Sequence, residues 1–143
     1  MKLFDATLDT LSRALDTRLE RQNVLAGNLA NSDTPGYQPM ELDFHAAMEA
    51  SERAQSLASH SASSTPAREG HLSVSDAPRL APGAPLPGMR GAASAHPSLD
   101  GNGVDLDRTL VAVSENALQY GAASKAAAKK LAILKYVASD GNA

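Results

Sequence analysis

The stretch Asn28-Leu-Ala-Asn-Ser-Asp-Thr-Pro-Gly-Tyr37 decides the fold, because a long helical pattern ends within it. Asn31 is a residue type that tolerates the left-handed backbone found at many helix ends. Pro35 disfavours helical backbone at the preceding Thr34, and a Pro-Gly pair suits the two central positions of a type II turn. We therefore expect a helix exit and a tight turn that directs Tyr37 back toward the helix.

The residues before this stretch carry an apolar stripe with spacings of three and four, which predicts one long amphipathic helix over residues 2–31. Arg18 and Gln22 stand where strict heptad spacing would place apolar residues, and we expect the stripe to shift onto Leu19. The alternative is that Arg18 and Gln22 make polar contacts that set the register of a helical assembly. The stripe consists of Phe4, Leu8, Leu11, Leu15, Leu19, Leu25 and Leu29.

Two interleaved heptad rows predict a second long helix over residues 106–138, with Asp105 as its N-cap. Small residues around Gly121 suit either a close approach of another backbone or simply weak patterning. We expect the rows to form a seam that packs on the first helix in an antiparallel, coiled-coil-like hairpin. One row is Leu106, Val113, Tyr120, Ala127 and Leu134, and the other is Leu110, Ala117, Ser124, Leu131 and Ala138.

The middle of the chain is dominated by small and turn-forming residues, since Ala, Ser, Pro and Gly make up 30 of the 50 residues in 51–100. A short helix is expected over 41–54, and residues 81–91 are typical of an extended, polyproline-like linker. The expected fold class is mainly α. We expect three zones: 1–54 with the long helix, the exit motif and the short helix, 55–100 as an extended low-complexity connector, and 101–143 as the second long helix.

The composition argues against an enzyme. Of 143 residues, 27 are Ala, and Leu, Ile, Val and Phe together also number 27. With no Trp, two Phe and three Tyr, little is available to line a substrate pocket. No Cys is present, which excludes disulfides, zinc thiolates and thiol nucleophiles. We expect no catalytic residue, no cofactor and no small-molecule substrate, and a core completed by partner chains.

Charge and motif patterns exclude further partners. The net charge of −3, without a basic face, predicts no nucleic-acid binding. The first residues lead directly into charged positions, so we expect neither a cleaved signal segment nor a membrane span. Residues 100–107 resemble a calcium loop only faintly, because Val104, Asp105 and Val111 replace required ligands or glycine. We expect a turn and a helix cap there, and no metal site at the four isolated histidines.

The string at 28–37, with Arg21-Gln-Asn-Val-Leu-Ala-Gly27 before it, resembles the N-terminal signature of bacterial flagellar axial proteins, which include rod and hook subunits. The resemblance covers roughly residues 1–48 and 96–138. Arg68-Glu-Gly-His-Leu72 is similar to a short motif of the family. The resemblance implies paired terminal helices that stack into a tube, and subunits that travel unfolded through the flagellar type III export channel.

The length does not accommodate the large inserted domains of hook and distal-rod subunits, and residues 97–107 and 116–120 resemble short subunits of the proximal rod. The resemblance thus implies a structural subunit of the basal body rod in the periplasmic space, exported without a cleaved signal segment. Its implied partners are copies of itself, other rod and basal-body subunits and the export apparatus. A soluble helical adaptor or chaperone of the export system is the alternative.

Two sets of residues are expected to carry assembly. The helix-exit motif consists of Asn28, Asn31, Asp33, Thr34, Pro35, Gly36 and Tyr37. The helix-packing seam consists of Leu8, Leu11, Leu15 and Leu29 from the first helix and Leu110, Val113, Tyr120, Leu131 and Leu134 from the second.

Overall fold

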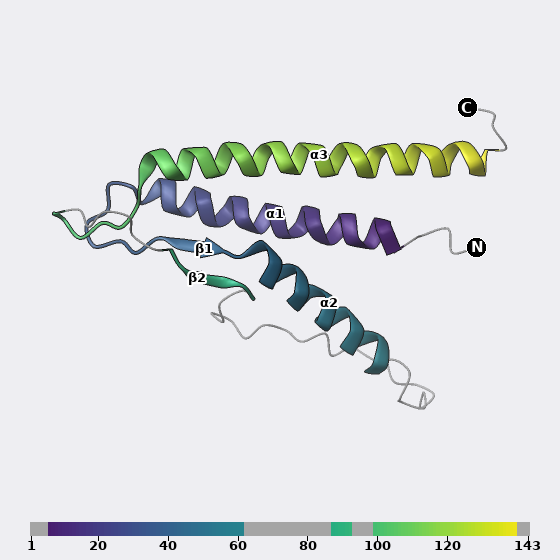
Figure 1. The fold of residues 1–143 in the computed structure, drawn as a ribbon, viewed down its shortest axis with the longest axis horizontal. Helices are drawn as coiled ribbons and strands as arrows, with labels where there is room; N and C mark the ends of the chain where they lie inside the picture. The colour runs from purple at the N-terminus through teal and green to yellow at the C-terminus, as the bar shows by residue number, and fades with distance from the viewer. Residues whose placement is uncertain (1–5, 62–86, 93–98, 140–143) are drawn as a thin grey trace, which may run out of the picture.

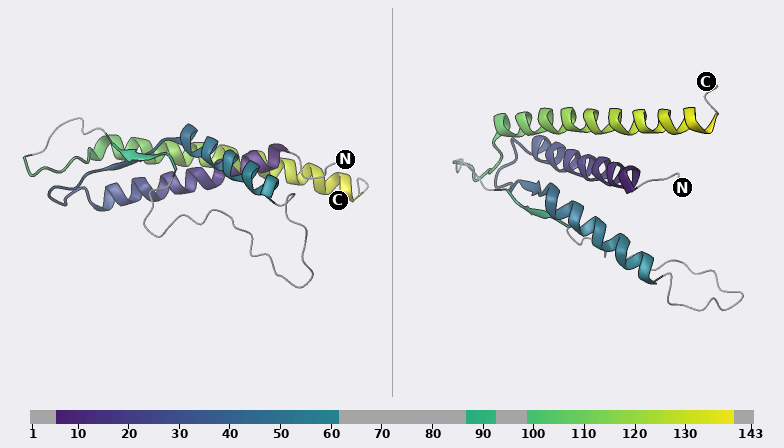
Figure 2. Two further views of the ribbon diagram at one scale, coloured as in Figure 1. Left: turned by 90° about the horizontal axis from the view of Figure 1, so that it is seen from below. Right: turned by 45° about the vertical axis from the view of Figure 1, so that its right-hand side comes forward.

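The computed structural model describes residues 6–61, 87–92 and 99–139. Helices α1 and α3 run antiparallel and side by side, while α2 diverges from them (Figures 1 and 2). The fold is mainly α, as expected, and the two long terminal helices pack together. The element order is α1 (Ala6–Ala30), β1 (Met40–Leu42), α2 (Phe44–Ser61), β2 (Met89–Gly91) and α3 (Leu106–Ala138).

The apolar core is thin. Leu25 and Leu42 are the buried hydrophobic side chains among the described residues. Helix α3 has 33 residues against 25 in α1, and its C-terminal end extends past the first described turn of α1 (Figure 1). Leu131, Ile133 and Tyr136 near that end are exposed. No helix in the described ranges has the length and apolar character needed to cross a membrane.

Helix α3 begins at the residue expected from the sequence. The Asp105 carboxylate accepts the backbone N–H of Arg108 at 3.0 Å, which confirms Asp105 as the N-cap. Asp107 lies in the first turn and Lys135 in the last, where both charges suit the helix dipole.

Helix α2 is capped by Asp43, whose carboxylate accepts the backbone N–H groups of His45 and Ala46 at 3.0 and 3.2 Å. The pKa of Asp43 is lowered, first by the N–H of Ala46 and further by the positive charge of Arg90. Arg90 lies in β2 and reaches both Asp43 at 3.4 Å and Glu41 of β1 at 3.5 Å. These ion pairs connect the strand pair to the start of α2.

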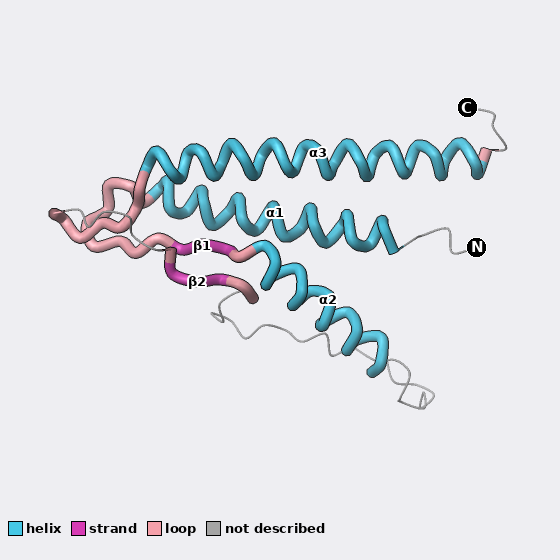
Figure 3. The backbone as a smooth tube through the Cα atoms, viewed as in Figure 1, coloured by secondary structure: helices cyan, strands magenta, loops and turns pink. Residues whose placement is uncertain are grey.

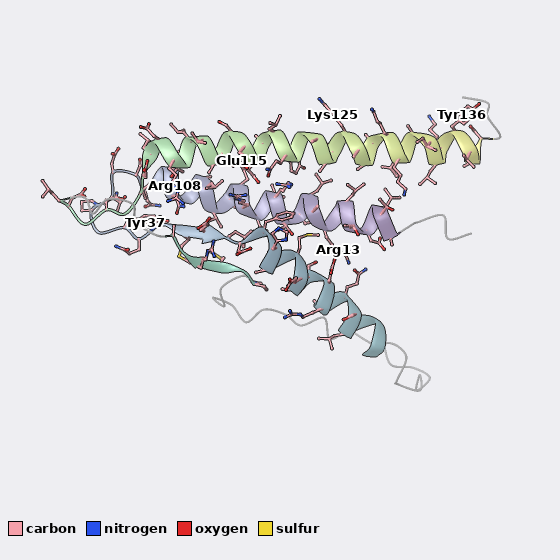
Figure 4. All side chains as sticks on the ribbon, in the orientation of Figure 1. Arg13, Tyr37, Arg108, Glu115, Lys125 and Tyr136 are labelled. Atoms are coloured by element: carbon pink, nitrogen blue, oxygen red, sulfur yellow. The ribbon has the colours of Figure 1, made fainter. Side chains whose placement is uncertain are left out.

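Polar side chains join α2 to α1. Arg13 donates a hydrogen bond to Gln55 and lies 3.8 Å from the Glu52 carboxylate (Figure 4). The Thr17 hydroxyl approaches the Met48 sulfur at 3.6 Å. Helix α2 is therefore attached along one side and has no further layer on it within the described residues.

The expected extended connector over 55–100 is wrong at both of its ends. Helix α2 continues through residues 55–61, because no Gly or Pro interrupts it and Glu49 pairs with Arg53 one turn later at 3.2 Å. Strand β2 lies within 81–91, where a linker is expected, and pairs antiparallel with β1, with Met40 opposite Gly91 and Leu42 opposite Met89. The Glu41–Arg90 ion pair stabilises this two-stranded sheet. Phe4 and the motif at 68–72 lie outside the described residues.

Gly88 brings the strand pair against the first turn of α2. Its carbonyl accepts the N–H of Asp43 at 2.9 Å, and its φ is 84°. A Cβ at this position would lie 2.9 Å from the backbone nitrogen of Ala47 and from the carbonyl oxygen of Asp43. Only glycine permits this approach.

Gly88→Ala is expected to lower the free energy of unfolding by more than about 1 kcal/mol, because the new methyl collides with backbone atoms and the positive φ is strained. Urea unfolding followed by circular dichroism measures this change. Gly91→Ala is the matched control, since a Cβ there meets nothing within 4 Å. Equal effects at the two glycines would contradict the packing role of Gly88.

Candidate functional site

The side chain of Asn28 acts as a partner for strand β1. Its Nδ2 donates to the carbonyl oxygen of Met40 at 2.7 Å, and its Oδ1 accepts the N–H of Met40 at 3.0 Å. The carboxamide thus satisfies both backbone groups of one residue, as a neighbouring strand would. The Tyr37 hydroxyl also donates to Asn28 Oδ1, at 3.3 Å. Asn28 is buried, so β1 is held at the end of α1 by one amide.

Asn31 closes α1 with its side chain. Its Nδ2 donates to the carbonyl oxygen of Gly27 at 2.8 Å, a group that the helix end would otherwise leave partly open. Its Oδ1 accepts the Thr34 hydroxyl at 3.3 Å. Both halves of the amide therefore stabilise the exit of the helix.

The Pro35-Gly36 pair forms the expected turn. The N–H of Tyr37 donates to the carbonyl oxygen of Thr34 at 3.2 Å, and the φ of Gly36 is 72°, as the third residue of a type II turn requires. Asp33 and Pro35 are exposed. The turn directs Tyr37 back to Asn28.

A second loop, residues 99–105 before α3, lies against this turn, and Figure 3 shows the two loops together at one end of the hairpin. The N–H of Gly36 donates to Asp100 O at 3.1 Å, and the N–H of Gly103 donates to Tyr37 O at 2.9 Å. The α-carbon of Gly36 is 3.6 Å from where a Cβ on Gly101 would lie, so a pair of glycines faces each other.

Asn102 is the central residue of this loop contact. It is buried, and its Nδ2 lies within hydrogen-bond distance of three carbonyl oxygens, at 3.1 Å (Asn31), 2.7 Å (Ser32) and 2.9 Å (Thr34). Its Oδ1 accepts the N–H of Val104 at 2.8 Å. One amide therefore ties the exit of α1 to the entry of α3. We call the joined loops 31–37 and 99–105 the junction.

A layer of polar side chains lies between the two long helices. Asn116 is only 1% exposed, and its Nδ2 donates to the backbone oxygen of Arg18 at 3.0 Å and to Gln22 Oε1 at 2.9 Å. Arg18 donates to Gln119, which in turn donates to Glu115 at 3.1 Å. We call Arg18, Gln22, Asn116 and Gln119 the polar layer.

Arg18 also contacts α2, since its guanidinium lies 4.5 Å from the centre of the Phe44 ring. Burial lowers the pKa of Arg18, and the nearby positive charge of Arg21 lowers it further, while Glu115 opposes the shift. Three helices therefore meet at this one cation.

The polar layer changes which side of α3 faces α1. The expectation that the apolar stripe shifts onto Leu19 is wrong, because Leu19 is 52% exposed while Arg18 and Gln22 contact α3. Arg18 and Gln22 do make polar contacts, with α3 of the same chain, and the alternative that such contacts set the register of an assembly stays a prediction. The buried side of α3, which includes Asn116, is one residue earlier than the expected second row, a difference of roughly 100° around the helix axis.

The expected seam is therefore only partly formed within the chain. Val113 and Leu134 of α3 are half-buried. The four expected leucines of α1 are half-buried too, namely Leu8, Leu11, Leu15 and Leu29. The second expected row is wrong as an intrachain contact, and Tyr120 of the first row is exposed too; the exposed seam members are Leu110, Tyr120 and Leu131. The residues one position earlier are buried or half-buried instead, namely Thr109, Asn116, Ala123 and Lys130.

Two residues that matter most here, Asn102 and Asn116, are absent from the expected exit motif and seam, although both lie in segments that carry the family resemblance. Asn102 stands between two glycines, Gly101 and Gly103, and that pattern marks a side chain in a tight loop. Asn116 is a polar residue on a helix expected to pack against the helix of Arg18 and Gln22. The presence of polar residues on both helices is the sequence signal that could have predicted their contact. Gly121, considered for close packing, has nothing within 4 Å of its Cβ position in the chain.

The site offers recognition and no visible chemistry. Among the described residues, no three His, Asp or Glu side chains group in a way that would hold a metal ion. A shallow cleft lies between α1, α3 and β1, with Val24, Met40 and Ala112 in its lining and Arg21 and Arg108 beside them. Its neutral polar side chains are engaged with backbone, since Asn28 bonds Met40 and the Thr109 hydroxyl donates to the backbone oxygen of Asp105.

A hairpin of terminal helices with a thin core, one tightly bonded end and outward-facing leucines defines a helical subunit of a larger assembly. Residues 8–38 match the family described as flagella basal body rod protein. The chain is 35% identical over 142 residues to flagellar basal body rod protein FlgB of Escherichia coli K12, covering 96% of each chain. It is also 35% identical to FlgB of Salmonella typhimurium, covering 81% of this chain and 80% of the relative, and 34% identical to FlgB of Yersinia enterocolitica, covering 81% of each.

This chain belongs to the family of flagellar basal body rod proteins. As a member, it is a structural and non-enzymatic component of the flagellar basal body.

Asn102→Ala is expected to lower the free energy of unfolding by about 2 kcal/mol, because the hydrogen bonds of a buried amide to the exit of α1 are lost together. Urea unfolding with circular dichroism detection measures the change. Asn23→Ala, at an exposed position of α1, is the matched control and is expected to change little. A small effect at Asn102 would mean that the junction does not depend on this amide.

Asn116→Leu is expected to leave the free energy of unfolding within about 1 kcal/mol of the wild type. The buried Oδ1 of Asn116 has no hydrogen-bond partner, and leucine removes this polar atom. The same change is expected to weaken the preference of α3 for α1 of its own chain, so that two chains associate as a dimer. Sedimentation of the purified chain measures this. Asn23→Leu, the same substitution at an exposed position of α1, controls for an added leucine and should leave the association state unchanged.

Proposed function

We propose that this chain is a subunit of the proximal part of the flagellar rod, and that its copies polymerise through their terminal helices into a tube that transmits rotation. The observation that carries this proposal is the 35% identity to a FlgB protein over 96% of both chains. The similarity spans the full hairpin and the junction, so the elements that would assemble are shared.

The exposed apolar side chains support assembly through α3. Helix α3 exposes several large apolar side chains, and the described part of the chain has no further element to cover them. They include Leu110, Leu118 and Leu131. Exposed apolar patches of this kind are typical of surfaces that bind other proteins. In a rod, neighbouring subunits would cover them.

The finer features of the proposal rest on the family resemblance. We propose that the chain crosses the inner membrane through the flagellar export apparatus, without a cleaved signal segment, and takes its place in the periplasmic part of the rod. Its partners there would be copies of itself and other rod and basal-body subunits. We propose that residues 1–54 and 101–143 form the assembling part and that 55–100 connects them, with residues 55–61 helical and 89–91 paired to β1.

The helix-exit motif and the helix-packing seam would have different tasks in such a rod. The junction gives the hairpin one fixed shape, because Asn28, Asn31 and Asn102 bond its backbone. The seam residues that face outward, among them Leu110 and Leu131, would bind neighbours. The adaptor alternative considered from the sequence finds no support in the comparisons.

Leu131→Asp tests the proposal. Because Leu131 is 52% exposed, the isolated hairpin should keep its helicity. A carboxylate buried between subunits costs several kcal/mol in every copy, so rods should not form and cells should not swim. The measurement is the swimming of cells that carry the variant as their only copy, with isolated basal bodies probed for the chain.

Leu131→Met is the matched control and should swim, since it keeps an apolar side chain of similar volume. A chain that is absent from basal bodies in wild-type cells, and that is found bound to export substrates in the cytoplasm, would contradict the rod proposal and favour the adaptor.

A further inference from the structure

Two arginines in the lining of the cleft beside the junction have no ion-pair partner among the described residues. Arg21 of α1 and Arg108 of α3 lie at its lining, with Arg108 at the start of α3 (Figure 4). Neither guanidinium forms an ion pair with any described residue. The two carboxylates of the lining are engaged, since Glu41 pairs with Arg90 and Asp105 caps α3. Within the described residues, the cleft therefore places two arginines without an ion-pair partner beside apolar side chains.

The floor of the cleft is apolar, with Val24, Met40 and Ala112. A fitting occupant is an apolar side chain flanked by carboxylates.

Such a group stands on the outer side of α1. Leu19 is 52% exposed, and Asp16 and Glu20 beside it are exposed as well. Neither carboxylate forms an ion pair among the described residues. Leu19 and Arg21 are two residues apart, which places them about 160° apart around the helix. The acidic side of α1 thus points away from the cleft of its own chain.

We infer that the cleft of one copy receives Leu19 of the next copy, with Asp16 and Glu20 of that copy beside Arg21 and Arg108. This inference rests on the proposed assembly of the chain with itself. The two complementary surfaces lie on opposite sides of one subunit, so the contact is heterologous. Repetition of a heterologous contact generates a ring or a helical tube, whereas a self-complementary contact would stop at a dimer.

Cysteine crosslinking tests the contact directly, because the chain contains no Cys of its own. Leu19→Cys combined with Ala112→Cys is expected to give covalent dimers and longer multimers in basal bodies from swimming cells after mild oxidation. Leu57→Cys combined with Ala112→Cys is the matched control, since Leu57 is an exposed leucine of α2 away from both surfaces. Only monomers are expected from the control pair.

Charge exchange provides a second test. Arg108→Glu places an acid in the first turn of α3, where it suits the helix dipole, so the chain should fold. It should nevertheless reduce the chain in basal bodies about tenfold, because like charges then meet in the contact. Asp16→Arg with Glu20→Arg should cause a similar loss. These three changes combined with Arg21→Glu exchange all four charges and should restore the amount to within about threefold of the wild type.

The outcomes separate this inference from the proposed function. If wild-type chain is missing from basal bodies, the rod proposal itself fails. If wild-type chain is present but the Leu19–Ala112 pair yields only monomers, or the combined charge exchange gives no recovery, the cleft contact is wrong while the rod proposal stands. Equal crosslinking of the Leu57 control would also overturn the cleft contact.

Discussion

The hydrogen bonds of one buried amide hold the described structure in its shape. Asn102 donates toward carbonyl oxygens of residues 31–34, and through them it joins the exit of α1 to the entry of α3. Without this tie, two helices separated by about 75 residues of chain would have to meet through a core that holds few buried apolar side chains. The loop-closure entropy of so long a connection is considerable. Asn28 holds β1 in a similar way, since its side-chain amide hydrogen-bonds to both backbone groups of Met40.

The contact between the long helices is polar at its centre, and this determines what remains available for partners. Asn116 bonds Arg18 and Gln22 inside the hairpin, so leucines such as Leu110 and Leu131 turn outward. Buried polar layers of this kind stabilise less than leucines would, yet they favour one register over others. Large apolar side chains of α3 therefore lie on the surface, where the proposed assembly would cover them.

Much of the fold follows from local patterns. The helix periods predict both long helices, Asp105 predicts the start of α3, and Pro35-Gly36 predicts the turn, because capping and turn geometry depend on residues close in sequence. The facing rows are predicted less well. The row of Leu110 follows heptad spacing and Leu19 continues the apolar stripe beside Arg18, yet both leucines are exposed, since spacing alone does not say which of two adjacent rows meets a partner. Strand β2 is missed because its partner, β1, lies about 45 residues earlier in the chain.

The sequence by itself determined the class of protein, the two terminal helices and the ten-residue exit motif, since each depends on residues that are close together in the chain. Only the tertiary structure decided that Asn102 bonds the exit motif, that Asn116 sets the rotation of α3, and that Gly88 packs on α2. The physical reason is that a hydrogen bond between distant segments depends on where both backbones lie. No local propensity specifies that, because an asparagine in a loop or on a helix is equally compatible with solvent until its partner carbonyl is in place.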